Sequence, residues 1–566
     1  MNDQLYQPPR RTLRRRALFP VLLLALFCSF AVAERRERLI GNWRPIHYDV
    51  SLVFNNELSE LTRAETKLDA LVLRNNLSMI DLDFGALAID SVSVGGRPAR
   101  YERPQGERLN VYLTRPARRG ERLRLSVVYH GRPADGLILT NDKDGHPSAT
   151  GDNWPNRLHH WIPALDHPSA KATVNFNVTA PTRMLVVANG RLDSRRTNAN
   201  ATQTWTYTEA APMPPYCMVV AVGEFAHLKP GVMLPTQLTA PVSYYVPPSD
   251  QKFALDGFGA AIPSLTYFSQ TIAPFPYAKL AHIIGATRFG GMENSGAIIY
   301  SRALFDPREN APVSSRFRVR RGLVELIAHE TAHQWFGDAV TPATWADLWL
   351  SEGFATYYAG LFVEHAEGQA AFREYMGRKR EEYFKYEVTR RAPIHDRVTE
   401  DLNELLNPNN YQKGAWVLHM LRAELGEAAF FRGVRAYYRA HLHRTATTED
   451  LRTALERASG RNLREFFARW VYASGHPRYE AAWSWSEHGR DRGGVLTLTL
   501  KQTQEDGTHY PNAMPVEIVT GTGTRRIKLS PTGRALSTRV YVNKRPTEVR
   551  FDPDATILKE LSLRPS

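Results

Sequence analysis

His329 and His333 are four residues apart, and Glu330 follows the first of them directly. On a helix, positions four apart lie on one face, so both imidazoles can bind one ion. Glu352, nineteen residues after His333, can add an oxygen ligand from a neighbouring helix. Three protein ligands leave one position of a zinc ion for water, as catalytic zinc requires. Glu330 would then lie beside that water and could act as its general base.

Two helices must position these groups. Residues 316–336 are apolar along one side, which predicts a buried helix with charged residues at its start. A second helix is expected to begin after Thr344, which forms a capping-box-like pair with Asp347. Glu352 would lie in the second turn of that helix. The alternative is a surface helix with two solvated histidines and an unrelated glutamate, but an unpaired carboxylate in an apolar segment would be costly to bury.

A second segment lies between two apolar runs and predicts a strand, or a strand edge, interrupted by glycines. It consists of Gly290, Gly291, Met292, Glu293 and Asn294. Glycine permits close approach of a ligand to the backbone, and Glu293 offers a carboxylate to a cation. Taken alone, the segment is more typical of a glycine-rich turn with a solvated glutamate. Tyr411 begins another apolar helix, and a lone tyrosine there is usually a packing residue.

Together these segments resemble the M1 (gluzincin) family of zinc aminopeptidases, whose hallmarks are H-E-x-x-H-x18-E, G-x-M-E-N and Y-x-K-G-A. All three occur here in that order, and weaker similarity extends over roughly residues 40 to 475. The resemblance implies one zinc ion per chain, held by His329, His333 and Glu352. It also implies that Glu330 is the general base of a hydrolytic reaction.

The same resemblance assigns substrate binding to the segment 290–294, with Glu293 binding the free α-amine of a peptide. Tyr411 would stabilise the transition state by donating a hydrogen bond to the developing oxyanion. A carboxylate near the metal pairs with an ammonium that only an N-terminus has, which predicts an aminopeptidase and disfavours an endopeptidase. Two further alternatives are an epoxide hydrolase with the same site and a non-catalytic peptide-binding protein. The intact site disfavours the second of these.

Many family members add a glutamine or glutamate from the N-terminal domain as a second amine contact. Counting back from Pro163 leads to Asn153 and Trp154, and only Asn153 could serve in that way. The adjacent His159 and His160 could bind a second metal ion. Their tryptophan and proline neighbours favour a packing or loop role instead.

Residues 1–33 are predicted to be a signal peptide. Five arginines precede an apolar stretch, residues 17–30, that is too short to favour a membrane span, and Ala-Val-Ala follows as a cleavage signal. We therefore expect export to the bacterial periplasm or the medium, with no stable membrane span after cleavage. Cys217 would then be the only cysteine, so no internal disulfide is expected.

The chain is basic, with a formal net charge of +14 over 566 residues. Its arginine clusters carry no nucleic-acid motif, so the charge indicates a solvated surface, and nucleic acid is not an expected partner. The expected partners are peptides with a free N-terminus. We expect a monomer.

Strand and helix periodicity divide the chain into three domains after the leader. Residues 34–241 predict an N-terminal β-sheet domain, 242–476 a thermolysin-like, mainly helical zinc-peptidase domain, and 477–566 a C-terminal β-sandwich. The predicted fold class is therefore multidomain α+β. Within the second domain, residues 447–460 predict a capped helix with a glycine stop. Larger M1 members carry a further helical domain that covers the active site. The chain ends too soon for one, so a more open site is expected.

Overall fold

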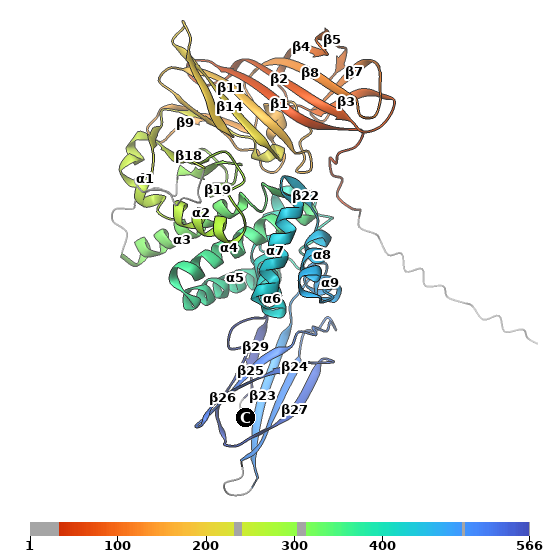
Figure 1. Ribbon diagram of the computed structural model, residues 1–566, viewed down its shortest axis with the longest axis vertical. Helices are drawn as coiled ribbons and strands as arrows, with labels where there is room; N and C mark the ends of the chain where they lie inside the picture. Colours follow the sequence, from red (N-terminus) through yellow and green to blue (C-terminus); the bar gives the residue numbers. More distant parts are fainter. Residues whose placement is uncertain (1–32, 231–239, 303–312, 489–492, 565–566) are drawn as a thin grey trace, which may run out of the picture.

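The computed structural model describes residues 33–230, 240–302, 313–488 and 493–564. The predicted signal peptide lies outside these ranges except for its last residue. Figure 1 shows a β-rich part, a mainly helical part and a second β-rich part in succession along the long axis of the molecule. This arrangement confirms the predicted multidomain α+β architecture.

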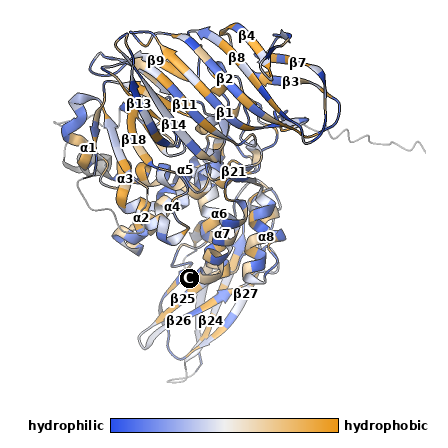
Figure 2. Cartoon of the chain, turned by 45° about the horizontal axis from the view of Figure 1, so that its top comes forward, coloured by the Kyte–Doolittle hydropathy of each residue, from blue (hydrophilic) through white to orange (hydrophobic). Residues whose placement is uncertain are grey.

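The N-terminal part is built on an eight-stranded sheet. Its order is β13 (Arg191–Thr197), β14 (Thr202–Met213), β11 (Ala172–Pro181), β1 (Trp43–Phe54), β2 (Leu61–Val72), β8 (Arg122–Gly131), β4 (Ala88–Val94) and β5 (Arg97–Pro98). In β1, every second residue from Tyr48 to Phe54 is buried, because alternate side chains of a strand point to one face. Figure 2 shows the resulting alternation of apolar and polar residues along these strands.

Two smaller sheets complete this domain. One contains β12 (Leu185–Ala188), β15 (Val220–Gly223), β10 (Pro147–Gly151) and β9 (Leu137–Asn141), and the other contains β3 (Leu77–Asp83), β7 (Arg108–Ala117) and β6 (Tyr101–Glu102). A short 3-10 turn, Leu158–His160, follows β10. Apolar residues of the large sheet, of β3 and β7, and of this turn form one continuous core.

The middle part combines a five-stranded sheet with nine helices among the described residues. The sheet order is β16 (Ala226–Leu228), β17 (Val242–Val246), β18 (Leu280–Gly285), β20 (Ala297–Ser301) and β19 (Gly291–Met292). The helices are α1 (Gln251–Gly257), α2 (Ala261–Thr271), α3 (Val313–His333), α4 (Trp349–Glu367), α5 (Gln369–Thr389), α6 (Gly414–Leu425), α7 (Glu427–His441), α8 (Thr448–Ser459) and α9 (Arg464–Trp470). The short strands β21 (Val340–Pro342) and β22 (Arg444–Ala446) pair in parallel. Strand β16 lies before residue 241, the predicted domain boundary, and pairs with β17, which lies after it. The exact position of the boundary therefore stays a prediction.

Helix α3 corresponds to the helix predicted over 316–336 and packs against α4. The predicted cap at Thr344 is wrong. Thr344 precedes a 3-10 turn, its hydroxyl donates to the Asp347 carboxylate, and α4 begins only at Trp349. Asp347 also accepts hydrogen bonds from the backbone N–H and the hydroxyl of Thr448, at the start of α8. Glu352 therefore lies in the first turn of α4, not the second.

Helix α8 has the predicted boundaries. Thr447 and Asp450 form a capping box at its start, and Gly460 adopts a left-handed conformation after its end. Helix α4 is buried on all sides from Trp349 to Val363, so it forms the centre of the helical part. Among the described residues, the helices are all too short or too polar to cross a bilayer.

The C-terminal part is the predicted β-sandwich, made of two sheets. One contains β27 (Ala535–Val542), β24 (Gly494–Gln502), β23 (Arg478–Glu487) and β29 (Glu560–Leu563), and the other contains β26 (Gly523–Leu529), β25 (Met514–Thr520) and β28 (Pro546–Phe551). Their facing apolar side chains, such as Leu498 and Val516, belong to the same core cluster as the helices. This shared core ties the sandwich to the helical part.

Candidate active site

The last turn of α3 and the first turn of α4 bring three potential metal ligands together. The Nε2 atoms of His329 and His333 are 3.0 Å apart, and they lie 3.2 and 3.3 Å from Oε2 of Glu352. Ligand atoms at ~2.0–2.2 Å from a tetrahedral zinc lie roughly 3.3–3.6 Å apart. The three atoms are therefore close to one face of such a tetrahedron, and they fit the predicted donor set.

His333 is oriented by groups on the far side of its ring. Its Nδ1 atom lies 3.1 Å from the carbonyl oxygen of Phe336 and 3.0 Å from Oγ of Ser351. Donation of the Nδ1 hydrogen to that carbonyl leaves Nε2, beside Glu352, as the nitrogen that could bind a metal ion. Such a partner fixes the tautomer that a metal ion needs.

Glu330 is buried at the same centre, and its atom Oε2 has no hydrogen-bond partner among the described residues. Its carboxylate lies against the backbone of Gly291 in β19. A Cβ atom built on Gly291 would be 2.3 Å from Oε1 of Glu330, whereas one on Gly290 would meet only Leu326, at 3.9 Å. The sequence predicted that these glycines allow a ligand to approach. At Gly291 the group that approaches is the Glu330 side chain.

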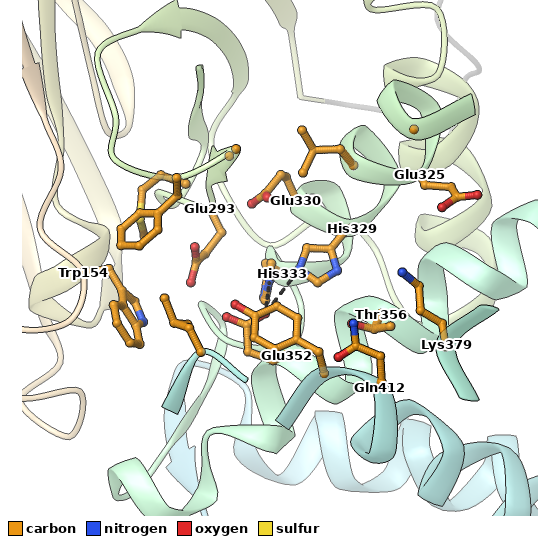
Figure 3. Close-up of a pocket in the computed structure, with 18 of the residues that line it drawn as sticks. Trp154, Glu293, Glu325, His329, Glu330, His333, Glu352, Thr356, Lys379 and Gln412 are labelled. Atoms are coloured by element: carbon orange, nitrogen blue, oxygen red, sulfur yellow. Dashed lines mark hydrogen bonds and ion pairs between the residues drawn. The ribbon is translucent and has the colours of Figure 1, made fainter. Parts of the chain in front are cut away.

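The segment 290–294 lies at the edge of the five-stranded sheet, where β19 pairs with β20. Gln334, directly after His333, accepts a hydrogen bond from the Gly296 backbone and donates one to the carbonyl of Glu293. These bonds hold Glu293 beside the histidine helix, and its carboxylate, that of Glu330 and an imidazole nitrogen of His333 lie within 4.8 Å of one another. In Figure 3, Glu293 and Glu330 both lie beside His333.

Two other residues of this segment contribute differently. Met292 is buried and lines the cavity beside Glu293. Asn294 is fully buried, and its side-chain amide lies 3.4 Å from the Met292 carbonyl. Asn294 does not line the cavity, so its predicted contact with substrate is not supported by its position.

Tyr411 is brought to the histidines by a single turn of π-helix, Asn409–Lys413, before α6. Its ring is nearly parallel to that of His329, with centroids 5.9 Å apart. The approach depends on two glycines, because a Cβ atom on Gly353 would lie 3.0 Å from the backbone of Gly414. The chain can therefore bring Tyr411 close to Glu352, the residue before Gly353. Single π-turns of this kind are frequent at functional sites.

A cavity of about 460 Å³ opens above these groups. The predicted residues that line it are Gly290, Gly291, Met292, Glu293, His329, Glu330, His333, Glu352 and Tyr411. Ten other residues also line it and were not predicted from the sequence, namely Trp154, Phe289, Gly322, Glu325, Leu326, Thr356, Tyr375, Lys379, Leu406 and Gln412. Glu325 could have been found, since it lies one helical turn before His329 on the same face. Phe289 and Gln412 adjoin predicted residues in the sequence, and Thr356 lies one turn after Glu352, whereas Trp154, Tyr375, Lys379 and Leu406 come from other segments.

Asn153, the suggested second amine contact, does not line the cavity. It is fully buried, donates to the carbonyl of Met218 and accepts from the indole of Trp161. The next residue, Trp154, lines the cavity and packs edge-on against Phe289. The N-terminal domain therefore contributes an aromatic wall to the cavity.

Burial and mutual repulsion dominate the electrostatics of the carboxylates. Burial raises the pKa of Glu330 well above its usual value. Burial also raises the pKa of Glu293 to about 7; the charge of His333 lowers this pKa and that of Glu352 raises it. Burial also disfavours ionisation of Glu352, but the charge of His333 and hydrogen bonds with both histidines lower its pKa to about 2. Glu352 is thus the carboxylate held as an anion. A divalent cation in the centre would lower the pKa values of Glu293 and Glu330 as well.

Comparison with protein-family models gives two adjacent matches. Residues 44–217 match the model described as "Peptidase M1 N-terminal domain", and residues 257–470 match the one described as "Peptidase family M1 domain". The second match contains all three sequence motifs.

Curated relatives show moderate identity over most of the chain. "Probable aminopeptidase 1" of Saccharolobus solfataricus is 27% identical over 76% of this chain and 53% of its own length. "Alanine/arginine aminopeptidase" of Saccharomyces cerevisiae is 25% identical over 86% of this chain and 58% of its own length. "Tricorn protease-interacting factor F2" of Thermoplasma acidophilum is 24% identical over 90% of this chain and 63% of its own length. The chain spans about half the length of the curated relatives it matches.

Proposed function

The chain belongs to peptidase family M1, and from this premise we propose that it is a zinc-dependent aminopeptidase that hydrolyses the N-terminal bond of peptides. The observation that carries the proposal is the juxtaposition of a buried carboxylate, Glu293, with the three-ligand centre. An endopeptidase has no use for an anion at that position, because internal peptide nitrogens carry no charge.

His329, His333 and Glu352 would hold the metal ion. A zinc ion there would lower the pKa of a water molecule and polarise the scissile carbonyl. The two neutral imidazoles and one carboxylate supply the nitrogen and oxygen donors that zinc prefers. Their near-tetrahedral spacing and the carbonyl partner of His333 support this assignment.

Glu330 would take the proton from the attacking water and deliver it to the departing amine. Its unpartnered oxygen and its position beside His333 leave it free to do so. A general base works best when its pKa is near the working pH, and burial moves Glu330 in that direction.

Tyr411 would donate a hydrogen bond to the oxyanion that develops on the scissile carbonyl. Burial, followed by the charge of Glu352, raises the pKa of Tyr411 well above its usual value, so the hydroxyl keeps its hydrogen at neutral pH. A fixed donor in a site shielded from water stabilises developing charge strongly.

Glu293 would bind the substrate ammonium and so place the first peptide bond over the metal centre. Trp154 and Met292 lie on the same cavity wall and would contact the first side chain. We also propose export of the chain by its N-terminal 33 residues, based on their arginine-rich start and apolar stretch.

The proposal is tested by Glu293→Gln, assayed on one peptide with a free or an acetylated N-terminus. A charge-assisted contact contributes about 1.5–3 kcal/mol, so kcat/KM on the free peptide should fall at least about tenfold. The acetylated peptide, already a poor substrate, should change little.

Glu325→Gln is the matched control, because Glu325 lines the same cavity on α3 but is not part of the Glu293–Glu330–His333 group. It should leave the preference for a free amine intact. Equal losses of the Glu293→Gln enzyme on both peptides would make Glu293 structural and would remove the basis for an aminopeptidase.

A further inference from the structure

A second cluster of metal-ligating side chains lies in the N-terminal domain, apart from the site described above. His159 and His160 come from the 3-10 turn after β10, and Glu107 comes from the turn between β6 and β7. One ligand atom from each of the three lies within 4.8 Å of the other two. The tryptophan and proline neighbours of this histidine pair favoured a packing or loop role, and nothing in the chain order indicates that Glu107 faces the pair.

The distances suit a small divalent cation. Oε2 of Glu107 lies 3.1 Å from Nε2 of His159, and Oε1 of Glu107 lies 3.6 Å from Nδ1 of His160. These separations bracket the edge of roughly 3.3–3.6 Å expected between ligands of a tetrahedral zinc ion. The two imidazole rings lie side by side, with centroids 4.3 Å apart.

His159 is oriented as a metal ligand would be. Its Nδ1 atom lies 2.8 Å from Oδ2 of Asp166, a buried carboxylate that also accepts the His159 backbone N–H. Asp166 is in turn held by its own backbone N–H, which donates to Asp83. With its Nδ1 hydrogen donated to Asp166, His159 could offer the lone pair of Nε2 to an ion bound beside Glu107. This carboxylate–histidine arrangement is the usual support of zinc-bound histidines.

The nitrogen of His160 that faces the cluster is buried and has no hydrogen-bond partner among the described residues. It lies against Gly85, where a Cβ atom would be only 2.9 Å away, so a side chain at this position would crowd the nitrogen. Backbone bonds fix the frame, because Gly85 donates to the carbonyl of His159 and Phe84 donates to that of Glu107.

Glu107 is held in the strained left-handed region, with φ of 57°, although it is not glycine. This conformation is unfavourable for a residue other than glycine, and such strained residues cluster at functional sites. Its side chain is half exposed, so an ion could enter from solvent.

We propose that His159, His160 and Glu107 form a second zinc site, which fastens the β6–β7 turn to the segment between β10 and β11. Water would complete the coordination. The site lies in the N-terminal domain and does not depend on the proposed peptidase activity.

The test measures zinc bound per full-length chain by mass spectrometry, after treatment with a chelator, reloading with zinc and desalting. The unaltered chain should hold two zinc ions, and a His329→Ala, His333→Ala chain should retain one. Adding Glu107→Gln or His160→Ala to that chain should remove the remaining ion. Glu102→Gln, in the same hairpin but outside the cluster, is the matched control and should retain it.

If the chain altered at His329 and His333 does not fold, Glu107→Gln in the otherwise unaltered chain should lower the count from two to one. The site is refuted if the unaltered chain holds a single zinc ion that disappears with His333→Ala. It is equally refuted if Glu107→Gln and His160→Ala leave the count unchanged. Either result would identify His159 as a protonated partner of Asp166 and Glu107.

Discussion

At the scale of single residues, Glu330 has the clearest conflict between burial and charge. One of its oxygens has no partner among the described residues, and its nearest carboxylate neighbours repel its charge. Leaving a buried polar atom unpartnered costs about 1–3 kcal/mol. A folded chain tolerates that cost where the group has a task, and the task that we propose for Glu330 is to accept a proton.

Glu330→Gln should therefore remove turnover while leaving zinc content and fold unchanged. The amide has the same shape but cannot take a proton from water, and general-base catalysis contributes roughly 10²–10⁴-fold. Steady-state kinetics on a free-amine peptide, with zinc quantified in the same sample, check this. Normal turnover in the zinc-loaded variant would exclude Glu330 as the base.

At the scale of secondary-structure elements, glycines decide how closely the site can assemble. Gly291 admits the Glu330 carboxylate, and Gly353 with Gly414 admits the turn that carries Tyr411. Gly291, two residues before Glu293, and Gly353, directly after Glu352, therefore serve close packing between elements. They do not supply unusual backbone angles, because Gly290, Gly291 and Gly353 are not among the positive-φ residues.

Gly291→Ala should impair catalysis much more than Gly290→Ala. The new methyl group would overlap Glu330 in the first case and meet only Leu326 in the second. A displacement of about 1 Å can cost roughly 10²-fold in rate, so kcat of Gly291→Ala should fall by about that factor. Gly290→Ala should stay within about twofold of the unaltered enzyme. Similar kcat values for the two variants would contradict this account of Gly291.

The elements also show where the sequence was sufficient. Periodicity and spacing predicted α3, the ligand on α4, the capped helix α8 and the three-part architecture, because these depend on neighbours along the chain. The start of α4 was misplaced because Asp347 bonds to Thr448, which is 101 residues away. For the same reason Glu107 and Trp154 were not recognised. Their partners are set by tertiary contacts that a single sequence does not display.

At the scale of the whole molecule, the candidate active-site cavity is lined by residues of two domains. The three proposed metal ligands all lie on α3 and α4, but Trp154 comes from the N-terminal domain and packs against Trp345 beside α4. Lys171, at the start of β11, joins the domains. Its Nζ atom donates to the carbonyls of Asp338 and Ala339 and to the hydroxyl of Thr341, at 2.7–2.8 Å.

Lys171→Met should loosen this junction, because methionine fills similar space but removes three hydrogen bonds. The Asp338 carbonyl keeps the Thr341 hydroxyl as a donor, whereas the Ala339 carbonyl loses the donor that Lys171 supplies. Each buried acceptor left unpaired costs about 1–3 kcal/mol, so the first transition in urea unfolding should move to a lower concentration. Trp154 in the cavity wall belongs to the N-terminal domain, whereas the three proposed metal ligands belong to the helical part. A looser junction should therefore raise KM more than it lowers kcat. Lys67→Met, a half-exposed lysine on β2 of the same sheet, is the matched control and should change stability by less than about 0.5 kcal/mol. An unchanged urea midpoint in Lys171→Met, or an equal shift in the control, would show that the junction does not rest on Lys171.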